Sequence, residues 1–371
     1  MSRTRMILGP WLKPLFTVIM GLVISALIAQ VTGYPAWTVL SALWAGSVGN
    51  LSNLASTLVI FVPLSLMGLG IAIAFRAGLF NIGAEGQYWM GAIAAAWVGA
   101  MGGRWLPGLH LVVLIMAAVV AGGLYALIPG LLKAYRGAHE VITTMMLSYA
   151  AIEFGHYLIE KGPLMLPGSI PESPPIEASA TLPILVPTTE LSEALFFALA
   201  GIIVAAWLLF RTRMGFEIQM TGKNSKAARL AGVSVPRLTV ISMMLSGMFA
   251  GLAGGLQISG VSHQLFDSFA NQYGYTAIVV ALLARNNPWG IIPSAFLFAA
   301  LQSGAGYMQM NAYIPAQIAY VIQGTIVLMV AIDRLFDGLG QKMGWFRKND
   351  NPPADPFPSI THAVVEEEGT L

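Results

Sequence analysis

Hydrophobic residues along this chain gather in long runs, and short polar, glycine- or proline-containing stretches separate the runs. A helix needs about 20 mostly apolar residues to cross the hydrocarbon core of a bilayer. Ten runs therefore predict about ten transmembrane helices, of which the third and the eighth are short for a complete crossing. The predicted spans are 14–32, 54–75, 88–101, 109–128, 142–160, 193–210, 238–259, 273–285, 291–308 and 315–333.

The composition places these runs in a membrane rather than in a soluble core. Hydrophobic residues make up 56% of the chain and charged residues 10%, with a mean hydropathy of +0.72, whereas a soluble domain carries roughly 25% charged residues. We expect an all-α integral membrane protein with the lipid bilayer as its surroundings. The net charge of +2 gives no sign of a nucleic-acid partner, and the absence of cysteine excludes disulfides and thiolate metal sites.

Lysine and arginine indicate the orientation, because they are enriched in cytoplasmic segments. If the N-terminus is cytoplasmic and ten spans alternate, only Arg104 and Lys161 of the 19 basic residues fall on the outer side. Dropping one span would place part of the remaining set on the wrong side. The distribution therefore predicts cytoplasmic N- and C-termini and an even number of spans.

Three polar regions interrupt or follow a transmembrane domain predicted over 1–341. Residues 161–192 form a proline-rich outer loop, expected to be either ordered by tertiary contacts or partly extended. Residues 211–237 form a basic cytoplasmic loop, and the polar tail 342–371 is predicted to be disordered. No internal repeat is evident in the sequence.

The cytoplasmic loop carries the signals of a short capped helix. Asn224 is a favoured residue at a helix start, Gly232 suits the left-handed position after a helix end, and Ala228 and Ala231 would share a small apolar face. A helix of about two turns is unstable alone, so this one must pack, and its small side chains would fit a groove on another protein. The candidate coupling residues are Gly222, Asn224, Ala227, Ala228, Arg229, Ala231 and Gly232. The alternative interpretation is an ordinary basic cytoplasmic loop.

A second candidate region, 75–87, breaks two apolar runs with three glycines. Irregular backbone at membrane depth survives only where protein covers it or where it lines a cavity. Asn81, Glu85 and Gln87 are therefore candidates for the translocation path, and Arg76 is the nearest candidate partner for the Glu85 carboxylate. The alternative is an interfacial turn with satisfied polar groups.

The remaining patterns indicate packing rather than chemistry. Three glycines spaced four apart, Gly247, Gly251 and Gly255, favour close helix packing. Gly222-Lys223-Asn224 lacks the upstream glycine and the hydroxyl residue of a phosphate-binding loop, and Thr143 stands where a zinc helix that starts at His139 needs a second histidine. The sequence therefore predicts neither an enzyme nor a metal site nor a cofactor bound by this chain.

Two stretches resemble signatures of a known family: 80–87, Phe-Asn-Ile-Gly-Ala-Glu-Gly-Gln, and 139–147, His-Glu-Val-Ile-Thr-Thr-Met-Met-Leu. Both are similar to permease subunits of ATP-binding cassette (ABC) importers for nucleosides and simple sugars, in the branched-chain amino acid/ribose-type superfamily. Residues 222–232 and the glycine-rich helix after them resemble the same family, so the similarity covers about 55–333. The most similar branch is the guanosine and purine-nucleoside type, which implies a ten-helix fold like that of the vitamin B12 importer.

The resemblance also implies partners and a location. It implies a separate cytoplasmic ATPase that holds ATP and Mg²⁺, with the capped helix 224–232 in a groove of that subunit. It further implies an extracytoplasmic binding protein and a second permease, for which a heterodimer is the preferred arrangement and a homodimer the alternative. The location is the inner membrane of a bacterium or archaeon.

Two rival functions remain open at this point. An ion-coupled secondary transporter of a small polar solute would need intramembrane carboxylates, for which Glu85 and Glu153 are the candidates. An intramembrane enzyme would need a nucleophile with its base, or a metal cluster, and the sequence suggests neither. The secondary transporter also leaves the capped helix 224–232 unexplained.

Overall fold

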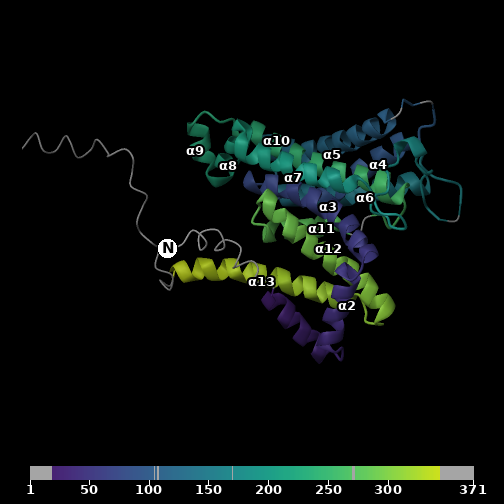
Figure 1. Cartoon of the computed structure of the whole chain (residues 1–371). Helices are drawn as coiled ribbons and strands as arrows, with labels where there is room; N and C mark the ends of the chain where they lie inside the picture. Colours follow the sequence, from purple (N-terminus) through teal and green to yellow (C-terminus); the bar gives the residue numbers. More distant parts are fainter. Residues whose placement is uncertain (1–18, 104, 107, 169, 270–271, 343–371) are drawn as a thin grey trace, which may run out of the picture.

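The computed structural model describes residues 19–103, 105–106, 108–168, 170–269 and 272–342, with side chains described up to residue 329. Within these residues the chain is helical, with two isolated β-bridges and no strand (Figure 1). A first described helix, Ile19–Val31, precedes the labelled ones. These are α2 (Ala36–Val48), α3 (Leu51–Arg76), α4 (Ala84–Gly99), α5 (Leu109–Arg136), α6 (Glu140–Glu160), η1 (Ala178–Ala180), α7 (Ala194–Arg211), α8 (Arg213–Lys223), α9 (Ser225–Leu230), α10 (Val235–Gln257), η2 (Ile258–Ser262), α11 (Tyr273–Leu283), α12 (Pro288–Asn311) and α13 (Gln317–Lys342).

Five helices in the described part of the chain are long and apolar enough to cross a membrane. They are α3, α5, α7, α12 and the continuous run of α10 and η2. Shorter apolar helices accompany them, including Ile19–Val31, α2 and α11. The all-helical membrane class is confirmed, whereas the count of ten crossings and the likeness to the vitamin B12 importer stay predictions.

The two spans predicted to be short are short helices in the structure. They are α4 with 16 residues and α11 with 11 residues, which correspond to about 24 Å and about 17 Å of helix. The hydrophobic pattern did not predict α2, because a 13-residue helix is shorter than a spanning run. Helix α2 instead packs closely against α12, since a Cβ on Gly46 would lie 2.3 Å from Tyr307 Cβ.

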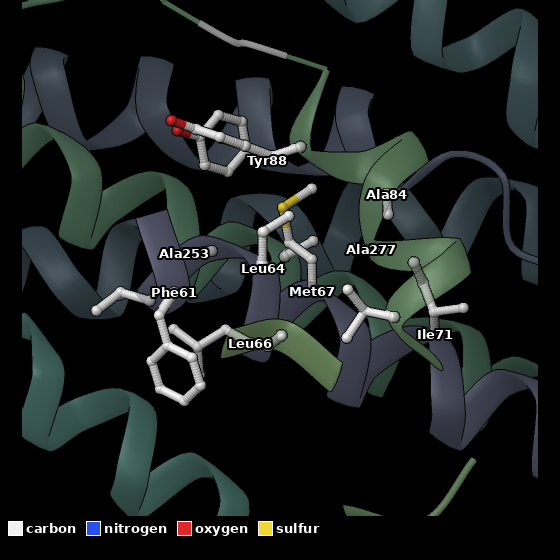
Figure 2. Close-up of a cluster of buried hydrophobic side chains, with 14 of the residues drawn as sticks. Phe61, Leu64, Leu66, Met67, Ile71, Ala84, Tyr88, Ala253 and Ala277 are labelled. Carbon is white, nitrogen blue, oxygen red and sulfur yellow. The ribbon is translucent and has the colours of Figure 1, made fainter. Parts of the chain in front are cut away.

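Helix α3 forms the centre of the bundle. Its apolar residues surround the whole helix, a pattern typical of a fully buried element, and 78% of its most apolar window is buried. It packs against α10, α11 and α12. Figure 2 shows Leu64 and Met67 of α3 with Ala253 of α10 and Ala277 of α11 around them.

The glycine face of α10 packs closely against α5, as the four-residue spacing predicts. A Cβ on Gly251 would lie 2.3 Å from the Ala118 carbonyl oxygen, and one on Gly247 would lie 2.3 Å from Ala126 Cβ. Gly255 would approach Ala118 Cβ to 2.6 Å. No side chain larger than hydrogen fits at these positions without a shift, so the prediction of close packing is confirmed.

Helices α3 and α10 run antiparallel, and each leads through an irregular segment into a short helix. Gly70 of α3 lies against Ser246 of α10, while Val62 nearer the start of α3 lies close to Leu256 near the end of α10. Segment 77–83 connects α3 to α4, and the segment after η2 leads to α11. The same order of elements thus occurs twice in opposite directions, and the two short helices begin inside the bundle.

The proline-rich loop 161–192 is ordered by tertiary contacts, one of the two expected alternatives. The Ser173 amide donates to the Leu265 carbonyl at 2.8 Å, and the Leu182 amide donates to the Ser259 carbonyl at 2.8 Å. The loop is therefore attached to the end of α10 and the segment beyond it. The predicted tail 342–371 lies, apart from Lys342, outside the described residues.

Candidate translocation and coupling sites

The two signature stretches, 80–87 and 139–147, lie against each other. Thr144 Oγ1 accepts a hydrogen bond from the Ile82 amide at 3.2 Å. A Cβ on Gly83 would lie 3.0 Å from the Thr144 Cβ and carbonyl oxygen, so only glycine permits this approach without a shift. The start of α4 is therefore held against the first turns of α6.

Asn81 is the centre of a buried hydrogen-bond network. Its Nδ2 donates to Gln87 Oε1 at 2.9 Å and to Ser246 Oγ of α10 at 2.8 Å. Its Oδ1 accepts from the Gly83 amide at 3.0 Å and from Gln87 Nε2 at 3.2 Å. Asn81 and Gln87 are 0% and 1% exposed, so this network fixes segment 77–83 to α10 in the protein interior.

Glu85 lies where α4 and α11 begin. It is in the first turn of α4 and accepts a hydrogen bond from the Gly274 amide in the first turn of α11, with the Gln272 amide also close. Helix N-termini carry partial positive charge, so a carboxylate placed at two of them is stabilised by both. Glu85 therefore joins two short helices that meet inside the bundle.

This geometry argues against direct contact between the candidate path residues and a solute. Asn81, Glu85 and Gln87 have partners within the chain and do not reach the surface of the described structure, which agrees with the alternative of satisfied polar groups. A role in the path stays a prediction and would act through the position of α4 and α11.

The expected pairing of Glu85 with Arg76 is wrong. Arg76 Nε donates to the Asn286 carbonyl at 2.6 Å, and Nη1 donates to Gln219 Oε1 of α8 at 2.6 Å. Its guanidinium also lies 5.0 Å from the centre of the Phe210 ring. Arg76 is the last residue of α3 and lies beside α8. Segment 77–83 separates it from Glu85 in the first turn of α4.

The basic loop 211–237 contains one more helix than expected. Helix α8 is capped at its N-terminus by Thr212, whose Oγ1 accepts from the Gly215 amide at 3.1 Å. Near its end, a Cβ on Gly222 would lie 2.0 Å from the Arg76 carbonyl oxygen. Gly222 thus permits a close approach between α8 and the end of α3, beside the start of segment 77–83.

The predicted short helix is confirmed as α9. Asn224 Oδ1 accepts from the amides of Lys226 and Ala227, both at 3.1 Å, which is the expected N-terminal cap. Gly232 follows the helix with φ of +82°, and no atom lies within 4 Å of the position that a Cβ would take, so backbone conformation alone explains the glycine. Figure 1 shows α9 at the left-hand end of the bundle.

The orientation of α9 differs from the prediction. Ala228 is 0% exposed and packs inside the chain, whereas Ala227, Arg229 and Ala231 are exposed. Ala228 and Ala231 therefore do not form one docking face. Leu230, which was not a candidate, is 91% exposed and is the large apolar side chain that α9 presents to the outside.

The long-range contacts of Asn81 and Glu85 gave no local signal in the sequence. Ser246 and Gly274 complete the interior site from 165 and 189 residues along the chain. Among the described residues, no group of three or more histidine or acidic side chains is arranged to hold a metal ion. The site is a set of hydrogen bonds and helix ends, which suits positioning rather than catalysis.

Comparison with known proteins identifies relatives over most of the length. Residues 53–331 match the family described as "Branched-chain amino acid transport system / permease component". The chain is 36% identical to the guanosine ABC transporter permease protein NupP of Bacillus subtilis (strain 168), over 86% of this chain and 92% of that protein. It is 32% identical to the glucose ABC transporter permease protein TsgB13 of Haloferax volcanii, over 87% of this chain and 93% of the relative. It is also 32% identical to the nucleoside ABC transporter permease protein NupB of Lactococcus lactis subsp. cremoris (strain MG1363), over 86% and 90%.

Proposed function

The chain belongs to the branched-chain amino acid transport system / permease component family, and on that premise we propose that it forms the translocation path of an ABC importer for a nucleoside or simple sugar. As an ABC transporter permease subunit, it is a non-catalytic membrane component. The observation that carries the solute class is the 36% identity to a guanosine permease over 86% of the chain. A nucleoside and a sugar share hydroxyl groups and a neutral ring, so one kind of path suits both.

We assign the contact with the ATPase to α9. The helix is capped by Asn224, lies at one end of the bundle and presents Leu230 together with the small residues Ala227 and Ala231 (Figure 1). Lys226 and Arg229 are exposed beside them and suit an acidic rim. This revises the predicted surface, because Ala228 supports the helix from inside.

Close contacts link α9 to the interior site. Gly222, just before α9, touches the Arg76 carbonyl group and Gly78, and segment 77–83 continues from there to Asn81 and the start of α4. A displacement of α9 by the ATPase would therefore move the segment that positions α4 and α11. ATP and Mg²⁺ would be held by the partner ATPase and not by this chain.

The second permease is proposed to be a different chain. One permease supplies one side of a path, and the resemblance described above favours a heterodimer. Expression of this chain with the ATPase and the binding protein, but without a second permease, is expected to give no uptake. Full uptake from that combination would establish a homodimer instead.

The extracytoplasmic binding protein is proposed to dock on the side of loop 161–192. Backbone hydrogen bonds fix this loop to the end of α10, so it offers a rigid surface. Figure 1 shows α9 and this loop at opposite ends of the bundle, as the two partners of an importer require.

Uptake measurements test the function directly. Deletion of the chain in its source organism is expected to abolish uptake of radiolabelled guanosine or glucose, and re-expression should restore it. Depletion of ATP should stop uptake while a protonophore should leave it largely intact over short times. Uptake that follows the proton gradient rather than ATP would favour the secondary transporter, and unchanged uptake of both solutes after deletion would refute the proposed solute class.

A further inference from the structure

Helix α6 has two faces of different character. One face carries Gly155 and other small residues and packs against α4. The opposite face carries Tyr149, Glu153 and Tyr157, spaced four residues apart and therefore aligned in one stripe along the helix. The exposed Met146 lies on the same face, nearer the start of the helix. Tyr149 and Tyr157 are 56% and 55% exposed, and Glu153 is exposed as well. We call these three residues the α6 stripe.

The exposed faces of α5, which packs against α6, and of α7 elsewhere in the bundle are mostly apolar. The large exposed side chains of α7 are Phe196, Leu199, Ile203, Val204, Trp207 and Phe210, and α5 shows a similar apolar row from Leu109 to Leu132. Such faces suit contact with lipid. At 21 residues α6 is long enough to span the bilayer, yet it is not among the five helices that are also apolar enough.

Glu153 lies well inside the length of α6. Glu160 at one end lies seven positions further along, about 10 Å of helix, and Glu140 at the other end lies thirteen positions before it, about 20 Å. A carboxylate at such a depth is costly against hydrocarbon, and intramembrane carboxylates face protein or water-filled cavities. The α6 stripe is therefore not a lipid-facing surface.

The α6 stripe has a polar neighbour on another helix. Tyr275 of α11 is half-buried and lies close to the hydroxyl groups of Tyr149 and Ser148. Beside it, Gln302 Nε2 of α12 donates to Thr276 Oγ1 at 3.4 Å. Tyr275 is in the first turn of α11, the turn that also holds Gly274, whose amide donates to Glu85.

We propose that the α6 stripe, together with Tyr275, is the wall along which the solute moves, and that the solute is a neutral polyhydroxylated molecule with a ring. This inference rests on the proposed function and specifies its contact residues. Tyrosine rings provide flat surfaces against which a base or a sugar ring packs, and the Glu153 carboxylate accepts hydrogen bonds from hydroxyl groups. Asn81, Glu85 and Gln87 lie behind this wall and set its position.

The absence of native cysteine allows a direct test by accessibility. Glu153→Cys and Tyr149→Cys are introduced singly into the full chain, assembled with the ATPase and the second permease but without the binding protein in membrane vesicles, and treated with a charged methanethiosulfonate reagent. Ala178→Cys in the exposed loop 161–192 and Ile203→Cys on the apolar face of α7 are the two controls. A thiol in apolar surroundings has a raised pKa and little thiolate, so Ile203→Cys should react at least about tenfold more slowly than Ala178→Cys.

The proposal requires Glu153→Cys and Tyr149→Cys to react at rates near that of Ala178→Cys. If both react as slowly as Ile203→Cys, lipid or a second subunit covers the stripe, and the proposal is overturned. This readout does not depend on which solute is carried, so it stands even if uptake of guanosine and glucose fails in the unmodified transporter. Such a failure would concern the proposed function alone.

A transport comparison completes the test where uptake of guanosine or glucose is established. Tyr149→Leu should lower uptake by roughly tenfold, since it removes a hydrogen bond and a ring surface, whereas Tyr135→Leu at the end of α5 should leave uptake unchanged. The same solute should slow labelling of Glu153→Cys but not of Ala178→Cys. Wild-type uptake by Tyr149→Leu, with no protection of Glu153→Cys, would show that the solute moves elsewhere.

Discussion

At the scale of single residues, Glu85 makes the most specific prediction. Its carboxylate accepts amide hydrogens at the start of α11, and a buried donor left without a partner costs about 1–3 kcal/mol. Glu85→Ala should therefore lower the thermal stability of the detergent-solubilised protein clearly. Glu85→Gln keeps an acceptor oxygen and should lose less.

The melting temperature, followed by size-exclusion chromatography after heating, is the measurement for both variants. Glu190→Ala, which removes an exposed carboxylate of loop 161–192, is the control and should leave stability unchanged. Equal losses in Glu85→Ala and Glu190→Ala would show that the contact between Glu85 and α11 contributes little to the fold.

Residues whose role is local were predictable, and residues whose role depends on distant contacts were not. Asn224 and Gly232 were identified because capping involves only the next few amides and one backbone conformation. The partners of Asn81 and Glu85 lie 165 and 189 residues away, and no local pattern indicates them. The assignment of Arg76 to Glu85 failed because nearness in sequence was used in place of nearness in space.

At the scale of helices, the glycine face of α10 predicts a sharp difference between two alanine substitutions. A Cβ on Gly251 would lie 2.3 Å from the Ala118 carbonyl oxygen, so α10 and α5 must separate to accommodate it. Overpacking of this kind typically costs about 1–3 kcal/mol. Gly251→Ala should therefore lower the melting temperature and the yield of monodisperse protein.

Gly306 in α12 is the matched control for that substitution. It is also a helical glycine, but nothing lies within 4 Å of its Cβ position. Gly306→Ala should be neutral or raise stability by about 0.4–1 kcal/mol, because alanine restricts the unfolded chain. Similar losses in both variants would mean that the close contact of α10 with α5 is not what holds these helices together.

The short helix α9 yields a prediction about coupling. Leu230 is 91% exposed, and a charge in its place should weaken an apolar contact with the ATPase. Leu230→Asp is expected to reduce co-purification of the ATPase and solute-stimulated ATP hydrolysis, with insertion of the permease unchanged. Ser234→Asp adds the same charge at an exposed position just before α10 and should retain both properties. Identical behaviour of the two variants would exclude Leu230 from the contact.

Hydrophobic runs were enough to locate the long helices, but not to orient the short ones. Runs near 20 residues identify α3, α5, α7 and α12 because only a helix satisfies its backbone inside a bilayer. Helix α2 was not predicted, because it is shorter than a spanning run and depends on contact with α12. Ala228 was assigned to the wrong face because the six residues of α9 are too few for a periodic pattern to identify the buried side.

At the scale of the whole molecule, composition identified a membrane protein, and two signature stretches identified its resemblance to permeases. The antiparallel relation of α3 with α10, each followed by a short helix, was not apparent from the sequence. Two structural repeats of this kind can share an arrangement of helices although their amino-acid sequences have diverged. In this bundle α9 and loop 161–192 lie at opposite ends (Figure 1).

The position of these two ends relative to the membrane is the last prediction. Only Arg104 and Lys161 of the 19 basic residues fall on the predicted outer side, and a lysine- and arginine-rich side faces the cytoplasm. Ala178→Cys in loop 161–192 should therefore react with an impermeant thiol reagent in intact cells, whereas Ser225→Cys in α9 should react only after the membrane is opened. Both positions are exposed, so a difference reports sidedness rather than burial. Reaction of Ser225→Cys in intact cells would place α9 outside, where no ATP-driven subunit can reach it, and both the orientation and the coupling role of α9 would be wrong.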